Sequence, residues 1–499
     1  FYAKKANESP ENYFLGGRTL GPWVAAMSAE ASDMSGWLLM GLPGVAYWCG
    51  IADAMWTAIG LGIGTYLNWL FVSKRLRRYS VINEAITLPE FFSNRFREEK
   101  KVVLTIAAIF ILVFFTVYAG SCLVTCGKLF STLFGTSYVT MMILGAVFVL
   151  VYTFLGGFLA ESVSDFMQAI IMIVVLVLIL GLGISHAGGM NSVMENVKSI
   201  PGFFDFFGIA TPVTENGVQV VENGAPVFGE AGSYGILSIC STLAWGLGYF
   251  GMPHVLLRFM AIGDANKLKL SRRVATVWVV ISMAVSVFIG VIGNAMTKAG
   301  VLPTLKDPET IILVVSDLIS KHGVLATIIA GLILAGILAA TMSTADSQLL
   351  AASSSASQNI LKEVFMKDMS EKTGMLIARI TVLVIALIGV FIARNPDSSV
   401  FQIVSFAWAG FGASFGPLVL LALFWKRSTF QGALCGMVSG GVMVFVWKFL
   451  IRPMGGALGI YELLPAFLLG LAVNVIVSLL TPAPSREVQD EFDKVASMK

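Results

Sequence analysis

The chain has 499 residues, of which 57% are hydrophobic and only 13% charged, with a formal net charge of +3 at pH 7. A soluble domain carries about 25% charged residues, and no soluble core could bury this much apolar surface. The composition excludes a soluble globular protein and predicts an all-α polytopic membrane protein. The sequence contains neither a GxxxxGK[ST] phosphate loop nor an HExxH zinc motif. We therefore do not expect an enzyme.

A helix that crosses a bilayer needs about 20 mostly apolar residues. About twelve stretches meet this condition, at 21–48, 51–73, 102–130, 138–158, 166–188, 234–256, 274–297, 324–356, 376–393, 398–424, 430–451 and 461–481. The first six residues resemble the cytoplasmic end of a helix, so we expect one more span to precede them.

The distribution of basic residues predicts the orientation, because cytoplasmic loops carry the excess of Lys and Arg. If residues 1–20 are cytoplasmic and the twelve spans alternate, 25 of the 33 Lys and Arg lie inside. This count places Arg258 in a cytoplasmic loop and the C-terminus in the cytoplasm. The basic run 267–273 then acts as a topology determinant, and no nucleic-acid partner is expected.

Two links between spans have recognisable patterns. Residues 77–101 are polar and basic with an amphipathic stretch at 88–92, which favours an interfacial cytoplasmic helix. Residues 187–233 form a long external segment in which two Asn-Gly pairs, at 216–217 and 223–224, flank a β-branched run. Such pairs are typical of a small β-hairpin, although a loose loop is an equal alternative.

Two spans are interrupted by residues that break helices. The first carries polar residues between Ser28 and Gly36, and the sixth carries three Gly followed by Pro253. Unwound backbone at membrane depth persists only where it lines a protein or water-filled cavity. Because each interrupted span opens a run of five, we expect a five-plus-five inverted-repeat transporter core with its site at the bilayer midplane. The expected parts are a first repeat at 21–188, an external loop at 187–233, a second repeat at 234–424, additional helices at 430–481 and a cytoplasmic tail at 482–499.

Asp33 is an ionisable residue in the middle of the first span. Such a residue costs about 2.5 to 3.5 kcal/mol on insertion scales and indicates a functional site by default. It could equally cap the second half of the broken helix, and the two roles are compatible.

The eighth span has a face lined with oxygen atoms. Ala340, Ser343, Thr344 and Ser347 follow the spacing i, i+3, i+4, i+7, so they share one helix face. Hard cations prefer oxygen ligands, although Ser and Thr also pack between membrane helices. Asp165 and Asp346, with Ser347, are candidates for an additional ion site, while we interpret Glu161 as an ordinary interfacial charge. The aromatic residues Tyr118, Trp245 and Tyr249 lie within spans and are candidates for lining a solute pocket.

The stretches 13–21, 31–44, 245–251, Pro253 with His254, and 339–344 resemble the sodium:solute symporter family, and within it the bacterial members that carry proline. The resemblance implies a sodium site made by the carbonyls of Ala31, Met34 and Ala340 and the hydroxyls of Ser343 and Thr344. It also implies that Asp33, Ser35, Gly36, Tyr118, Trp245, Tyr249 and Pro253 border the solute, and that Arg18 serves cytoplasmic gating or coupling. A multi-pass protein of the bacterial cytoplasmic (inner) membrane is expected, with sodium, a small solute and the bilayer as partners.

No Lys or Arg is expected in the middle of a span, which favours a neutral or zwitterionic solute such as L-proline. The alternative within transport is another small solute, such as the sugar acid sialic acid, pantothenate or another carboxylate. An ion channel or a membrane enzyme is the alternative of a different class, but the sequence has no carbonyl filter motif and no nucleophile cluster.

Overall fold

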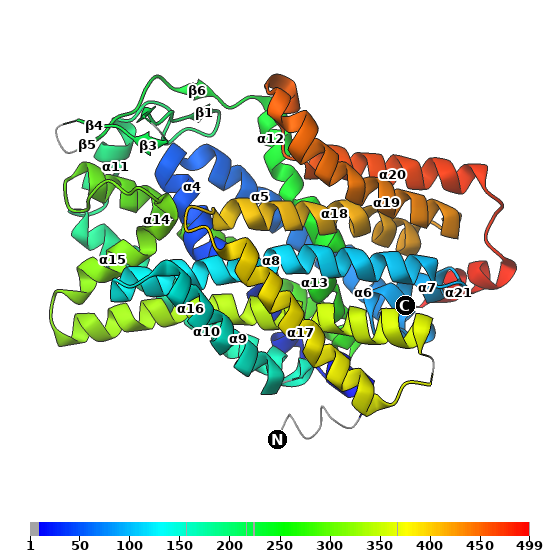
Figure 1. Cartoon of the computed structure of the whole chain (residues 1–499). Helices are drawn as coiled ribbons and strands as arrows, with labels where there is room; N and C mark the ends of the chain where they lie inside the picture. The colour runs from blue at the N-terminus through cyan, green and yellow to red at the C-terminus, as the bar shows by residue number, and fades with distance from the viewer. Residues whose placement is uncertain (1–8, 156, 216, 223–224, 367, 499) are drawn as a thin grey trace.

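The computed structural model describes residues 9–155, 157–215, 217–222, 225–366 and 368–498, which form a bundle of helices (Figure 1). The first half contains α2 (Pro10–Leu15), α3 (Pro22–Asp33), α4 (Leu42–Cys49), α5 (Ile51–Leu67), α6 (Ser73–Ile82), α7 (Leu88–Arg95), α8 (Val102–Phe134), α9 (Tyr138–Leu155), α10 (Phe158–His186) and α11 (Met190–Lys198). The second half contains α12 (Ile236–Leu243), α13 (Pro253–Ala261), α14 (Leu268–Lys298), α15 (Ile311–Ser320), α16 (Val324–Ser354), α17 (Glu371–Ala393), α18 (Val400–Phe424), α19 (Phe430–Val446), α20 (Leu463–Leu480) and α21 (Arg486–Ser497).

Short 3₁₀ or π segments extend or join these helices. They are η1 (Gly16–Arg18), η2 (Trp37–Gly41), η3 (Asn68–Val72), η4 (Ala244–Gly251), η5 (Ala265–Lys267), η6 (Pro308–Thr310), η7 (Ser355–Phe365), η8 (Trp447–Ile451), η9 (Arg452–Met454) and η10 (Gly456–Leu458). Of these, η4 occupies the interruption that the sequence predicts in the sixth span, and η2 follows directly after the one predicted in the first span.

Among the described residues, nine helices are long and apolar enough to cross a membrane. A tenth span is the bent pair Ile236–Gly251 and Pro253–Ala261, whose axes differ by 46°. The apolar helices Trp37–Cys49 and Tyr138–Phe154 are shorter; the first covers the second half of the predicted stretch 21–48, and the second lies within the predicted stretch 138–158. The chain is a multi-pass membrane protein, and the break predicted in the sixth span is confirmed.

Both interrupted helices lie inside the bundle. Helix α3 packs against α10, α14 and α16, while η4 packs against α5 and α18. Helix α8 runs beside α16 and α18 through the centre (Figure 1). A Cβ atom on Gly246 would lie 2.2 Å from the carbonyl oxygen of Gly60, so α5 and η4 meet backbone to backbone. Small residues permit this close approach between membrane helices.

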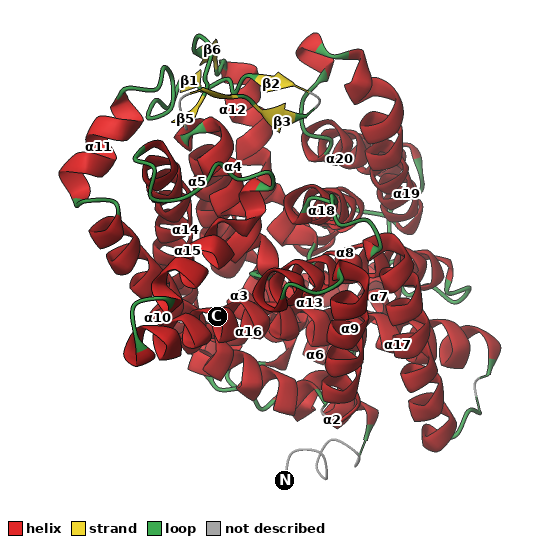
Figure 2. Cartoon of the chain, turned by 60° about the vertical axis from the view of Figure 1, so that its left-hand side comes forward, coloured by secondary structure: helices red, strands yellow, loops and turns green. Residues whose placement is uncertain are grey.

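The segment 187–233, expected to be external, contains three pairs of two-residue strands. The pairs are β1 (Gly208–Ile209) with β6 (Gly232–Ser233), β2 (Thr214–Glu215) with β3 (Val218–Gln219), and β4 (Val221–Glu222) with β5 (Ala225–Pro226), all antiparallel. The predicted hairpin is confirmed and is followed by a second one; residues 216, 223 and 224 of the expected turns lie outside the described part. The strands gather at one end of the bundle (Figure 2), where β1 contacts α5.

At the opposite end of the bundle, α7 lies within the 77–101 link, where a helix is expected. Its residues Leu88, Phe91 and Phe92 are buried, and the Phe92 ring stacks on Phe415 of α18 at 5.9 Å. The apolar face of α7 therefore packs against protein. The tail helix α21 contacts α6, so Arg486–Ser497 is part of the packed structure.

Candidate ion and solute site

The first span breaks immediately after Asp33. Met34 leaves the helix with φ −87° and ψ 74°, and the N–H of Ser35 donates to the Asp33 carbonyl at 3.1 Å. The Ser35 hydroxyl accepts from the N–H of Trp37, the first residue of η2, at 3.4 Å. Because Ser35 turns back to Asp33, the carbonyl of Ala31 is available to partners outside α3.

The hydroxyls of α16 converge on that free carbonyl. Ser343 Oγ lies 2.8 Å from the Ala31 oxygen and 3.1 Å from the Ala340 oxygen. Thr344 Oγ1 lies 3.5 Å from the first and 3.1 Å from the second. All four residues are fully buried. The structure thus brings together four of the five oxygen donors expected at the sodium site, and Met34, the fifth, follows in the adjacent non-helical link.

These oxygen atoms can serve a cation because hydroxyl hydrogens rotate. With no ion nearby, Ser343 and Thr344 donate to the carbonyls; when their hydrogens turn away, every oxygen presents a lone pair to the centre. The cluster is uncharged, which suits a monovalent ion with carbonyl and hydroxyl ligands.

Asp33 connects this region to the second interrupted helix. Its Oδ2 accepts a hydrogen bond from the Tyr249 hydroxyl at 2.7 Å, while its carbonyl accepts from the Tyr118 hydroxyl at 2.9 Å and from Trp37 Nε1 at 3.0 Å. Among the described residues, Oδ1 has no hydrogen-bond partner. The capping role considered for the Asp33 carboxylate is not seen, because its Oδ2 accepts from Tyr249 and its Oδ1 has no partner among the described residues.

Trp245 is the centre of an aromatic cluster. Its ring stacks on Trp37 at 6.0 Å and on Tyr461 at 5.1 Å, and its carbonyl accepts from Trp408 Nε1 at 2.8 Å. A Cβ on Gly248 would lie 1.9 Å from Trp408 Nε1, so only Gly fits between the two. The sequence analysis did not select Trp37 and Trp408 as candidates for lining a solute pocket. The signal that could have found them is the position of both tryptophans inside predicted spans.

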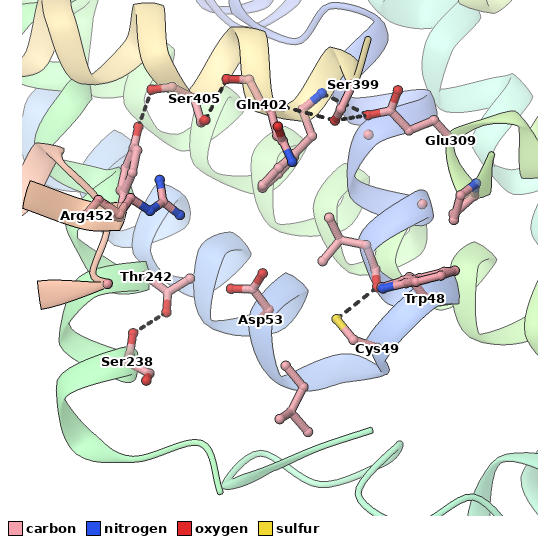
Figure 3. Close-up of a pocket in the computed structure, with 18 of the residues that line it drawn as sticks. Trp48, Cys49, Asp53, Ser238, Thr242, Glu309, Ser399, Gln402, Ser405 and Arg452 are labelled. Carbon is pink, nitrogen blue, oxygen red and sulfur yellow. Dashed lines mark hydrogen bonds between the residues drawn. The ribbon is translucent and has the colours of Figure 1, made fainter. Parts of the chain in front are cut away.

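A cavity of about 1320 Å³ reaches this cluster from the end of the molecule that carries the strands. Figure 3 shows polar groups of several helices facing it, among them Asp53 of α5, Thr242 of α12 and Gln402 of α18. Trp245 lines its wall. The other residues expected to border the solute do not line it: Asp33, Ser35, Gly36, Tyr118, Tyr249 and Pro253 are all buried. Of the residues expected to border the solute, Trp245 is thus the one that lines this cavity.

Gly36 and Pro253 have structural roles that the structure makes explicit. A Cβ on Gly36 would lie 2.2 Å from Thr125 Oγ1, so Gly allows η2 to approach α8. Pro253 is the first residue of α13, where its missing N–H costs nothing.

Arg258 corrects two expectations. It lies in α13 with 1% of its surface exposed, so the assignment to a cytoplasmic loop is wrong. Its guanidinium pairs with Glu161 and with Asp165, the latter at 3.1 Å, and donates to Ser347 Oγ at 2.7 Å. Glu161 is therefore a buried ion-pair partner and not an interfacial charge. The sequence signal for a buried Arg258 is that it follows His254 by one helical turn and that its neighbours are still apolar.

The candidates for an additional ion site lie around this guanidinium. Arg258 binds Asp165 and Ser347 directly, while Asp346 Oδ1 accepts from the Ser347 N–H at 2.8 Å. A second buried cation, Lys128 of α8, pairs with Glu309 at 2.8 Å. Both cations lie near the ends of their helices, Arg258 in α13 (Pro253–Ala261) and Lys128 in α8 (Val102–Phe134), so the expectation of no Lys or Arg in the middle of a span is not contradicted by them, and both are paired with acids.

Hydrogen bonds from Arg18 hold the segment before α3 against the end of the bundle opposite the cavity. Its guanidinium donates to the carbonyls of Met260, Ala85 and Ser80, at 2.9, 2.7 and 3.1 Å, and it pairs with Glu11 at 3.3 Å. Burial lowers the pKa of this guanidinium, but an Arg side chain stays protonated in proteins. These bonds suit the gating role expected of Arg18.

Two interrupted helices that meet in a membrane bundle, with free carbonyls and hydroxyls at the junction, define a secondary transporter of the ion-coupled class. The sodium:solute symporter family model matches residues 13–440, and the chain belongs to this family. It is 39% identical to the osmoregulated proline transporter OpuE of Bacillus subtilis, covering 97% of this chain and 92% of the relative. It is 40% identical to the high-affinity proline transporter PutP of the same organism, covering 99% and 97%. It is 39% identical to the sodium/proline symporter of Salmonella typhimurium, covering 99% and 92%.

Solved structures with the same fold are more distant in sequence. A Na⁺-coupled sialic acid symporter in a substrate-bound, outward-open state superposes with a TM-score of 0.75 at 17% identity, covering 97% of this chain and 95% of the other. Mhp1, a nucleobase-cation-symport-1 family transporter, superposes with a TM-score of 0.57 at 14% identity, covering 98% and 100%. This likeness establishes the transporter fold.

Proposed function

We propose that this symporter couples the inward movement of sodium to the uptake of L-proline by alternating access. The observation that carries the proposal is the convergence of the Ser343 and Thr344 hydroxyls on the Ala31 carbonyl, 2.8 and 3.5 Å away. Sodium is bound there by the carbonyls of Ala31, Met34 and Ala340 and by these two hydroxyls. The ion holds the broken first span against α16 and so favours the conformation that accepts solute.

The choice of proline rests on the relatives and on the chemistry of the aromatic cluster. Three relatives at 39–40% identity over nearly the full chain are named as proline transporters or symporters. Trp245 lines the cavity and stacks on the rings of Trp37 and Tyr461, and an aromatic cluster of this kind suits a small ring. Arg258 and Lys128 are each paired with acids, so neither offers a free charge to an anionic solute. This favours a zwitterion over a sugar acid or pantothenate.

The solute site proposed here spans the two sides of Trp245. Proline enters from the cavity, and rotation of Trp245 admits it to Asp33, Ser35, Gly36, Tyr118, Tyr249 and Pro253. The free amides of the second half-helix, which begins beyond Ser35, then face the carboxylate of proline, as half-helix N-termini do for anionic groups.

One sodium ion is energetically sufficient for this uptake. Its movement down about 100 mV yields about 2.3 kcal/mol, and a tenfold concentration ratio adds about 1.4 kcal/mol. Together these support roughly a 500-fold gradient of a neutral zwitterion.

The conformation described is consistent with access from the outer face. We infer that the strands and the large cavity lie outside, that the Arg18 and Arg258 networks close the cytoplasmic side, and that the C-terminus is cytoplasmic in a bacterial inner membrane. Residues 21–188 and 234–424 form the two inverted repeats in this scheme. The predominance of Lys and Arg in the links at the Arg18 end supports the orientation.

Uptake of radiolabelled solute into proteoliposomes tests the proposal. With inward sodium and potassium gradients compared in parallel, proline should accumulate only with sodium. Accumulation of proline in potassium alone, or of sialic acid or pantothenate in preference to proline, would count against it.

A further inference from the structure

Two histidines that are far apart in the sequence lie ring to ring in the structure. The chain has three histidines. His186 is the last residue of α10, and His322 lies in the turn between α15 and α16. Their ring centroids are 5.1 Å apart, and the ring planes are inclined at 75°. Because α10 belongs to the first half of the chain and α15 to the second, only the folded bundle brings this pair together.

Each imidazole is held by its own helix through Nδ1. His186 Nδ1 lies 2.8 Å from the Leu182 carbonyl oxygen, and His322 Nδ1 lies 3.0 Å from the Leu318 carbonyl oxygen. A carbonyl oxygen can only accept a hydrogen bond, so both Nδ1 atoms carry the hydrogen. In the neutral form, Nε2 is then the nitrogen with the free lone pair in both rings. A bond from the other ring nitrogen to a carbonyl is also what orients most metal-ligating histidines.

The separation of the two rings fits one shared metal ion. Zinc binds histidine nitrogen at about 2.0 to 2.1 Å with tetrahedral angles, so two imidazoles bound to one zinc ion through Nε2 have centroids about 5 Å apart. The centroids of His186 and His322 are 5.1 Å apart. Ring packing alone does not require both Nδ1 atoms to be bonded to a backbone carbonyl, whereas a shared ion requires both Nε2 atoms to be free.

The pair is accessible to a metal ion from solvent. His322 is exposed and His186 is half-buried, and neither lines the large cavity. The third histidine, His254, is fully buried. No group of three or more His, Cys, Asp or Glu side chains suited to a metal ion is found in the part of the chain that the structure describes. Water would therefore complete the coordination, and two protein ligands give a site of moderate affinity.

We propose that His186 and His322 together bind one divalent transition-metal ion of the zinc and copper class through their Nε2 atoms. The bound ion links the end of α10 to the turn between α15 and α16, two helices against which α10 packs. In the orientation proposed above the site faces the outside, because the segment 187–233 starts directly after His186. The site itself does not rest on the proposed solute or on the proposed sodium ligands.

Zinc titration of the purified full-length chain, carrying no polyhistidine tag, tests this inference. In detergent at slightly alkaline pH, which keeps imidazole neutral, calorimetric titration with zinc chloride should give one ion per chain. His186→Ala and His322→Ala should each weaken the affinity at least tenfold. Glu230→Gln removes an exposed acid from the segment that follows α10; it is the control for non-specific binding and should leave the affinity unchanged. Absence of zinc binding by the native protein, or unchanged binding in either histidine variant, would overturn the proposal.

Copper provides a second measurement, which needs no variant. Cu²⁺ binds nitrogen ligands more tightly than Zn²⁺ does, and its electron paramagnetic resonance spectrum shows how many nitrogens coordinate each ion. The native protein should bind one Cu²⁺ through two imidazole nitrogens. A spectrum with a single imidazole nitrogen for each ion would mean that each histidine binds an ion alone, and it would overturn the shared site. Because this reading is made on the native protein, it decides the question even if a histidine variant fails to fold.

Discussion

The Tyr249 hydroxyl donates to Asp33 Oδ2 at 2.7 Å, and this bond joins the two interrupted helices of the bundle. Asp33 is the last residue of α3 and Tyr249 lies in η4. Ala31, whose carbonyl faces the α16 hydroxyls, is two residues before Asp33. The bond thus connects the proposed sodium ligands with the span that carries Trp245.

Tyr249→Phe should weaken the dependence of proline affinity on sodium. The substitution leaves both oxygens of a buried carboxylate without donors, at a cost of about 1 to 3 kcal/mol, and disconnects η4 from α3. We expect the sodium-induced increase in proline affinity, measured by equilibrium binding, to fall at least fivefold. The double variant Asp33→Asn, Tyr249→Phe should be more thermally stable than Tyr249→Phe alone. A buried neutral amide without hydrogen-bond partners costs less free energy than a buried carboxylate without donors. A double variant less stable than both single variants would contradict this coupling.

Replacing Ser343 and Thr344 with Ala should raise the sodium concentration for half-maximal proline uptake at least tenfold. Both hydroxyls are removed from the oxygen cluster, while the helix and its membrane insertion remain. The matched control is Ser353→Ala with Ser354→Ala, on the same helix, where each hydroxyl bonds only to a carbonyl of its own helix, at 2.9 and 2.8 Å. Sodium activation of uptake in proteoliposomes is the measurement. Equal shifts in both double variants would remove Ser343 and Thr344 from the site.

Proline at micromolar to millimolar concentration should raise the melting temperature of the purified protein in sodium and have little effect in potassium. A ligand stabilises the state that it binds, and sodium favours that state here. Trp245→Ala should abolish the shift while sodium binding persists, since the proposed ion ligands lie on α3 and α16. Trp447→Ala is the control, because its indole bonds to the Ile460 carbonyl at 3.2 Å away from α3 and α16. Stabilisation by sialic acid or pantothenate but not by proline would exclude proline as the solute.

Arg258→Gln should destabilise the protein strongly. It leaves Glu161 and Asp165 buried without their cation, and breaking a buried pair in this way costs about 3 to 5 kcal/mol. The triple change Arg258→Gln, Glu161→Gln, Asp165→Asn should recover much of the melting temperature, because no unpaired charge remains. Lys321→Gln, which breaks the exposed pair with Asp317, should change the melting temperature little. If Arg258→Gln changes the melting temperature only slightly, Glu161 and Asp165 are not both ionised in the native protein.

The sequence alone was enough for the features that depend on local composition. Apolar length predicted the spans, because each must cross the hydrocarbon core by itself, and Gly and Pro residues near 245–253 predicted the bend now seen at 46°. The oxygen-bearing face of Ala340, Ser343 and Thr344 followed from helical periodicity. The Asn-Gly pairs predicted one small hairpin in the 187–233 segment, where the structure has two.

Tertiary structure decided what depends on partners from distant parts of the chain. From the sequence alone, a charged residue such as Arg258 is expected in a loop. In the structure α3, α10 and α16 surround it, and its guanidinium donates to Ser28, Asp165 and Ser347. Trp245 lines the large cavity while its ring packs against Trp37 and Tyr461, which are far apart in sequence. Periodicity determines which face of a helix is polar, but a charge or a ring acquires its role only from the groups that other helices place beside it.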